Sequence, residues 1–93
     1  MRNLTADDFE EKTGTVYEVS VQDALFPLTL TSFQPLTGSG REGGSFRLEF
    51  RGPAEPILAQ AIYPFRGGGE ELDIFIVPTG RDQDGTRYEA VFF

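Results

Sequence analysis

The chain of 93 residues has no cysteine, no histidine and no tryptophan. Without cysteine there is no disulfide, no thiolate metal ligand and no cysteine nucleophile. Without histidine the chain lacks the commonest general base and the commonest metal ligand. These absences remove most of the usual catalytic centres, so we expect no catalytic residue, no metal site and no cofactor.

Long apolar runs are also missing. No run approaches the roughly 18 residues that a helix needs to span a bilayer, so we expect no membrane partner. Residues 1–5 lack the apolar stretch of a signal peptide. We therefore expect synthesis in the cytoplasm, which is compatible with later incorporation into a particle or fibre.

Basic side chains are scarce. Eight Lys and Arg residues stand against 15 Asp and Glu residues, which gives a net charge of −7. Nucleic-acid binding needs clustered cations to neutralise phosphates, so we expect no nucleic-acid partner. Nine Phe and three Tyr residues nevertheless supply large apolar side chains for a core. The length fits a single domain over residues 1–93.

A short helix is predicted at the N-terminus, over about residues 4–13. Thr5 can act as N-cap, and the acidic residues that follow suit the positive end of a helix. Leu4 and Phe9 have the spacing of a hydrophobic staple, and Gly14 ends the segment. Nine residues make a weak helix alone, so Leu4 and Phe9 must dock on the rest of the fold.

The rest of the chain alternates between apolar stretches and Gly- or Pro-containing turns, which is typical of short strands. Short turns favour an antiparallel meander, because parallel pairing needs long crossovers. A six-stranded sheet with a thin core tends to close or to fold onto itself. The predicted fold class is therefore all-β, a small barrel or sandwich with the helix at one end. The six predicted strands are residues 15–21, 25–33, 45–51, 57–65, 72–77 and 86–93.

The strand over residues 45–51 alternates most regularly. Phe46, Leu48 and Phe50 share one face and are predicted to face the core. The opposite face carries Arg47, Glu49 and Arg51. We expect these three charged side chains to face water or to pair with another subunit.

Two later strands carry apolar residues on both faces. In residues 72–77 the second face holds Phe75 and Val77, and in residues 88–93 it holds Val91 and Phe93. A strand with one solvated face should alternate apolar and polar residues. Either the helix or a loop covers this second face, or Phe75, Val77, Val91 and Phe93 form an interface with a partner.

Several short motifs contain the first residues of a ligand-binding loop but lack the remaining residues that such a motif requires. Asp82-Gln83-Asp84-Gly85 starts like a calcium loop, but its twelfth position holds Phe93 instead of Glu. The Gly-rich segments at 38–40 and 67–69 precede no predicted helix and no Lys-Ser or Lys-Thr pair. No histidine is present to activate a serine. We therefore expect a protein that is not an enzyme.

Five segments spread over almost the whole chain carry a resemblance: Leu4 to Phe9, Phe50-Arg51-Gly52-Pro53, Gln60 with Tyr63, Phe75-Ile76-Val77-Pro78 with Gly80, and Arg87 to Phe92. Together they resemble a family of small bacterial proteins known only as a domain of unknown function. Such proteins are often encoded beside phage-tail-collar-like proteins of the microcystin-dependent type. The resemblance implies a part in a tail-like or extracellular fibre assembly, and it supplies no catalytic residue.

These observations predict a structural or assembly module that associates with a protein partner or with itself and takes no small-molecule substrate. Its interface would consist of the two-faced strands and the charged face at residues 47–51. The alternative is a small ligand-binding barrel that holds an apolar or sugar-like molecule between its Phe-rich strands and the loop at residues 38–44. Because a six-stranded barrel is usually filled by its own side chains, the assembly function is favoured.

Overall fold

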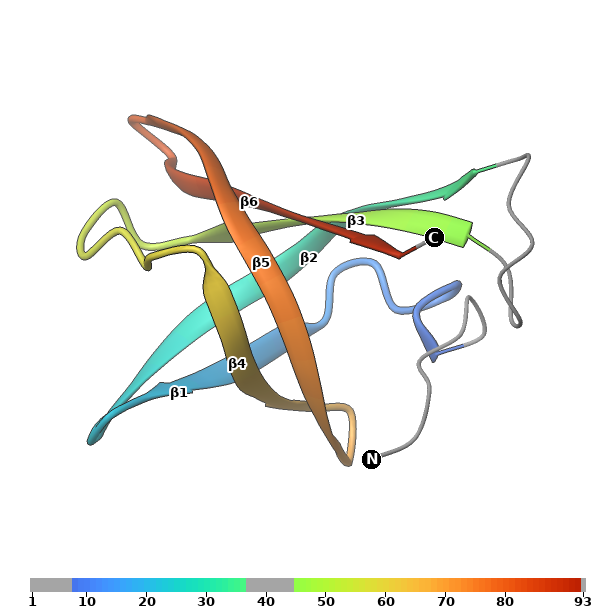
Figure 1. Cartoon of the computed structure of the whole chain (residues 1–93), viewed down its shortest axis with the longest axis horizontal. Helices are drawn as coiled ribbons and strands as arrows, with labels where there is room; N and C mark the ends of the chain where they lie inside the picture. Colours follow the sequence, from blue (N-terminus) through green and yellow to red (C-terminus); the bar gives the residue numbers. More distant parts are fainter. Residues whose placement is uncertain (1–7, 37–44, 93) are drawn as a thin grey trace.

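The computed structural model describes residues 8–36 and 45–92, and within them the chain is all-β (Figure 1). The number of strands and the fold class agree with the prediction. The strand whose bounds differ most from the prediction is β5, which was expected to end before Pro78 and instead continues to Asp82. The strands are β1 (Val16–Val21), β2 (Ala24–Leu36), β3 (Ser45–Gly52), β4 (Ala61–Gly67), β5 (Glu70–Asp82) and β6 (Gly85–Phe92).

The six strands form one closed antiparallel sheet in the order β1-β2-β3-β6-β5-β4, a barrel. The sheet closes where β1 meets β4, through the pairs Glu18↔Arg66 and Val19↔Phe65. The predicted meander is correct only within each half of the chain. Residues 53–60 carry the chain from β3 to β4, so that β3 pairs with β6 and not with β4.

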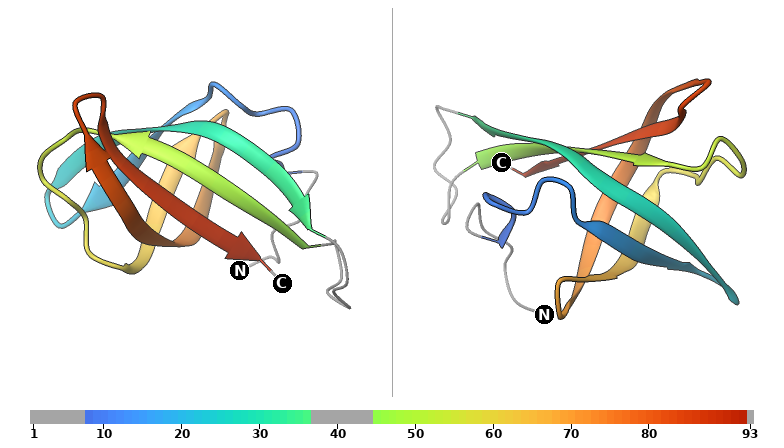
Figure 2. Two further views of the ribbon diagram at one scale, coloured as in Figure 1. Left: turned by 90° about the horizontal axis from the view of Figure 1, so that it is seen from above. Right: turned by 180° about the vertical axis from the view of Figure 1, so that it is seen from behind.

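The long strands β2 and β5, 13 residues each, make closure possible. The first part of β2 pairs with β1 and its second part with β3, while β5 is divided in the same way between β4 and β6. Each long strand has an irregularity where it changes partner, between Leu30 and Ser32 in β2 and between Pro78 and Gly80 in β5. A bulge bends a strand and increases its twist, which lets β2 and β5 turn the corners of the barrel (Figures 1 and 2).

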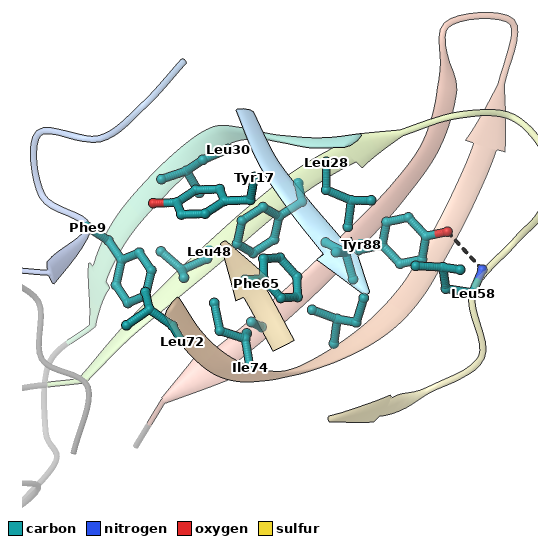
Figure 3. Packing of buried hydrophobic residues seen from close by; sticks show 14 of the residues in the cluster. Phe9, Tyr17, Leu28, Leu30, Leu48, Leu58, Phe65, Leu72, Ile74 and Tyr88 are labelled. Atoms are coloured by element: carbon teal, nitrogen blue, oxygen red, sulfur yellow. Dashed lines mark hydrogen bonds between the residues drawn. The ribbon is translucent and has the colours of Figure 1, made fainter. Parts of the chain in front are cut away.

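The interior of the barrel is filled by side chains from all six strands (Figure 3). Three aromatic rings meet at its centre: Tyr17 and Phe50 lie 6.0 Å apart between centroids, Tyr17 and Phe65 5.9 Å, and Phe50 and Phe65 5.0 Å. The inward faces predicted for residues 46, 48 and 50 are confirmed. The buried apolar residues are Phe9, Tyr17, Val19, Leu28, Leu30, Phe46, Leu48, Phe50, Leu58, Phe65, Leu72, Ile74, Ile76, Tyr88 and Ala90.

Two residues outside the strands close the two ends of this core, and Figure 3 shows them at opposite ends of the cluster. Phe9 is fully buried, with its ring 5.6 Å from that of Phe46 and 6.1 Å from that of Phe92. Leu58, in the connection between β3 and β4, lies at the other end. Its backbone N–H donates a hydrogen bond to the Tyr88 hydroxyl at 2.9 Å in a buried position.

The helix predicted over residues 4–13 is not shown. Residues 1–7 lie outside the described residues, and residues 8–13 form turns. The Lys12 N–H donates to the Phe9 carbonyl at 3.0 Å and the Thr15 N–H to the Lys12 carbonyl at 2.9 Å, spacings of three residues instead of the four of an α-helix. Gly14, with φ of 96°, then leads the chain into the sheet. The prediction that Phe9 docks on the rest of the fold is confirmed, although residues 8–13 form turns. Within residues 8–36 and 45–92, no helix has the length and hydropathy to cross a membrane.

Candidate interaction surface

The outer face of β5 and β6 exposes apolar side chains that the sequence had singled out. Phe75 lies between the buried Ile74 and Ile76 and is 46% exposed, because its side chain points away from the core. Val91, on the outer face of β6, is 37% exposed. Phe93 lies outside the described residues. The described part of the chain leaves both Phe75 and Val91 uncovered.

A third apolar side chain, Ile62, joins this surface from β4. Ile62 pairs directly with Phe75 across the β4–β5 ladder and is 66% exposed. On the β6 side of β5, the ladder between the two strands ends at the outward-facing pair Val77↔Glu89. Beyond that pair, the next outward residue is Phe75 on β5 and Val91 on β6. We call Ile62, Phe75 and Val91 the apolar row.

Sequence reasoning missed Ile62 although a signal was present. Tyr63 and Phe65 alternate on one side of β4 and pack on the core, which leaves Ile62 on the other side. Val77, which the sequence included, is half-buried opposite Glu89 and flanks the apolar row.

Next to the apolar row, one guanidinium binds two carboxylates. Arg47 pairs with Val91 across the β3–β6 ladder, and Glu49 pairs with Glu89. Arg47 Nε donates to Glu89 Oε2 at 2.8 Å, and Arg47 Nη2 donates to Glu49 Oε2 at 3.2 Å. The hydrogen bond to Glu89 is the main cause that raises the pKa of Arg47 above its ordinary value.

Further along β3, two cations share one carboxylate. Arg51 and Arg87 face each other across the ladder, and Asp82 binds both: Arg51 Nη1 donates to Oδ1 at 3.0 Å, and Arg87 Nη1 donates to Oδ2 at 3.2 Å. The Asp84 N–H donates to Asp82 Oδ1 at 2.8 Å. This backbone hydrogen bond, followed by the one from Arg51, lowers the pKa of Asp82.

These pairs bear on the prediction that Arg47, Glu49 and Arg51 pair across subunits. In the described structure all three are half-buried and form ion pairs within the chain. Pairing with another subunit stays a prediction, and it would have to compete with these internal partners.

A shallow hollow of about 440 Å³ opens where β3 ends and β2 continues without a β3 partner. Arg51 and Asp84 are its charged residues, and Arg51 Nη1 lies 3.9 Å from Asp84 Oδ2. Among the described residues, no group of three or more carboxylates is arranged to hold a metal ion. The hollow is lined by Pro27, Thr29, Thr31, Arg51, Gly52, Pro53 and Asp84.

Taken together, these features define a small all-β domain: one closed antiparallel sheet around an aromatic core, with an apolar row on its outside. The chain belongs to the family described as a domain of unknown function, DUF6916, whose model matches residues 4–92. The resemblance to an uncharacterised domain family is thereby confirmed. No curated protein and no solved structure matches the chain.

Proposed function

We propose that this domain is a non-enzymatic assembly module that contacts another protein through the apolar row. The observation that carries the proposal is the exposure of Ile62, Phe75 and Val91, at 66%, 46% and 37%, on three successive strands of one sheet. Apolar side chains scattered singly over a surface are ordinary, whereas a group of them marks an interaction site. Aromatic side chains that become buried on binding, as Phe75 would at such a contact, contribute much of the energy of protein interfaces.

The sheet also supports the proposal because it holds Phe75 in place. Its chain neighbours Ile74 and Ile76 are fully buried, and Ile62 pairs with it on the adjacent strand. A backbone that is already fixed in a sheet loses little conformational entropy on binding. An anchor of this kind suits a stable contact in an assembly.

Two further parts of the proposal have narrower support. The setting, an accessory part of a tail-like or extracellular fibre assembly, rests on the resemblance given above. The non-enzymatic character is supported by the absence of Cys and His and by the pairing of the half-buried charges Arg47 and Arg51 with carboxylates. The alternative, an apolar or sugar-like molecule held between the Phe-rich strands and the loop at residues 38–44, involves a loop that lies outside the described residues. Among the described residues, the space between the strands holds the side chains of the hydrophobic core.

Phe75→Asp tests the proposal, with Val16→Asp as its control. Val16 is 54% exposed on the outer face of β1, away from the apolar row, so both variants add one negative charge to an exposed strand position. We expect both to stay folded, with free energies of unfolding within about 1 kcal/mol of the wild type. Used as bait in an extract of the cells that make the protein, wild type and Val16→Asp should retain a partner that Phe75→Asp loses.

Retention of the same proteins by all three baits would contradict the proposal. Unfolding of Phe75→Asp, measured by circular dichroism, would show that Phe75 belongs to the core. In that case the milder Phe75→Ser replaces it in the same comparison.

A further inference from the structure

We propose that the partner of the apolar row is a basic protein surface and not a second copy of this chain. That surface presents Lys or Arg side chains two residues from an apolar side chain on an extended segment. The inference rests on the proposed function and adds the chemistry of the partner. Its basis is the charge that surrounds the apolar row.

The first element of that charge is Asp73. It lies on the outer face of β5, two residues before Phe75, opposite Pro64 of β4. Within the described part of the chain, Asp73 forms no ion pair. Outward side chains two residues apart on a strand are separated by about 7 Å. A cation on a partner that buries Phe75 is therefore within reach of the Asp73 carboxylate.

The second element is the Arg47 cluster on the other side. Glu49 and Glu89 share the single guanidinium of Arg47, at 3.2 Å and 2.8 Å, so the cluster keeps an excess of one negative charge. Both carboxylate side chains are 31% exposed and accessible from outside. Among the described residues, Asp73 and the Arg47 cluster together place three carboxylates and one guanidinium beside the apolar row.

Charges further from the row do not reverse this sign. Arg66 pairs with Glu71 at 3.1 Å. Arg51 and Arg87 pair with Asp82, and Arg51 Nη1 also lies 3.9 Å from Asp84 Oδ2, so two carboxylates balance these two cations. The whole chain carries −7, so two copies repel each other at long range while a basic partner is attracted. The apolar row thus supplies the contact, and the surrounding charge selects the partner.

Two short peptides serve as probes: acetyl-Lys-Ser-Val-Ser-Lys-amide and acetyl-Glu-Ser-Val-Ser-Glu-amide, which place their charges two residues from the Val, on its face of an extended chain, and are equal in apolar content and opposite in charge. Each is titrated into the full ¹⁵N-labelled chain and followed by amide chemical shifts. We expect the Lys peptide to shift amides of residues 62, 73, 75 and 91, and to bind at least about fivefold more tightly than the Glu peptide. Raising the salt from about 20 mM to about 300 mM should remove most of that difference.

Two variants separate local charge from net charge. Asp73→Asn removes the carboxylate beside the apolar row, and Asp23→Asn removes an exposed carboxylate in the turn between β1 and β2. Both change the net charge equally. We expect Asp73→Asn to weaken binding of the Lys peptide about two- to fivefold and Asp23→Asn to leave it within experimental error.

Equal binding of both peptides, equal effects of the two variants, or shifts confined to other faces would overturn the inference. A stable dimer in light scattering that Phe75→Asp dissociates would also overturn it, because the occupant would then be a second copy. That last result would leave the proposed function standing. The proposed function itself is tested separately, by the comparison of the Phe75→Asp and Val16→Asp baits.

Discussion

The hydrogen bond between Leu58 and Tyr88 gives the sharpest prediction about the fold. Tyr88→Phe deletes only the hydroxyl that accepts the Leu58 N–H at 2.9 Å. Tyr88 is fully buried and Leu58 is 5% exposed, so water cannot easily replace the lost acceptor. The residues between β3 and β4 would then carry an unsatisfied donor at the end of the barrel.

The magnitude follows from that geometry. Leaving one buried backbone donor unsatisfied costs about 1–3 kcal/mol. A domain of this size loses roughly 4–8 °C of Tm per kcal/mol, so a mid-range loss is easily measured. Tyr63→Phe is the matched control, because the Tyr63 hydroxyl donates to the Ala59 carbonyl at 2.6 Å in an exposed position where water can take its place. We expect that control to cost less than about 0.5 kcal/mol.

Urea unfolding of the wild type and the two variants measures these differences, and amide hydrogen exchange locates them. The Leu58 amide should be protected in the wild type and in Tyr63→Phe, and should exchange faster in Tyr88→Phe. Equal losses in the two variants, or an unprotected Leu58 amide in the wild type, would refute the reasoning.

Three further predictions concern other parts of the barrel. Gly85 has φ of 128° and a Cβ there would collide with a backbone carbonyl of β3, whereas Gly14, with φ of 96°, faces open space. Gly14→Ala should therefore cost about 1–2 kcal/mol in urea unfolding and Gly85→Ala clearly more, and equal costs would argue against the collision. The lowered pKa of Asp82 means that its contribution to stability is complete at neutral pH and is lost as the pH falls through the folded-state pKa. In an NMR titration of that carboxyl, Arg51→Gln should raise the pKa toward its ordinary value, and an unchanged pKa would count against the ion pair. Phe9→Ala should lower the free energy of unfolding by about 3–5 kcal/mol, since Phe9 is fully buried, and a loss below 1 kcal/mol would show that Phe9 does not close the barrel.

The strands and their faces were predictable because alternation is a local property of the chain. Phe46, Leu48 and Phe50 are buried as their spacing required. The outward direction of Phe75 follows in the same way from the burial of its neighbours, whereas its exposure does not, because the sequence left open whether the helix or a loop covers this face. Side-chain direction in a strand depends only on the parity of the position, so a short segment determines it.

The order of the strands could not be read from the sequence, because it depends on pairing between distant segments. Pro78 and Gly80 look like the end of a strand, yet β5 continues past them by forming a bulge and taking β6 as a new partner. Residues 8–13, the described part of the predicted N-terminal helix, form turns for a related reason. Burial of Phe9 is satisfied by a turn, so the weak local preference for a helix did not decide the structure.

The candidate surface was only partly predictable. Phe75, Val77 and Val91 were predicted because each of their two strands carries apolar residues on both faces. Ile62 stands alone on the outer face of its strand, and only the β4–β5 register shows that it adjoins Phe75.

The central claim is that the apolar row touches another protein, and photo-crosslinking tests it most directly. The photoreactive residue benzoylphenylalanine replaces Phe75 in the full chain, expressed in the cells that make the protein, and replaces Val16 in a matched control. We expect a defined protein adduct from position 75 that position 16 does not form. No adduct from position 75, or the same adducts from both positions, would contradict it.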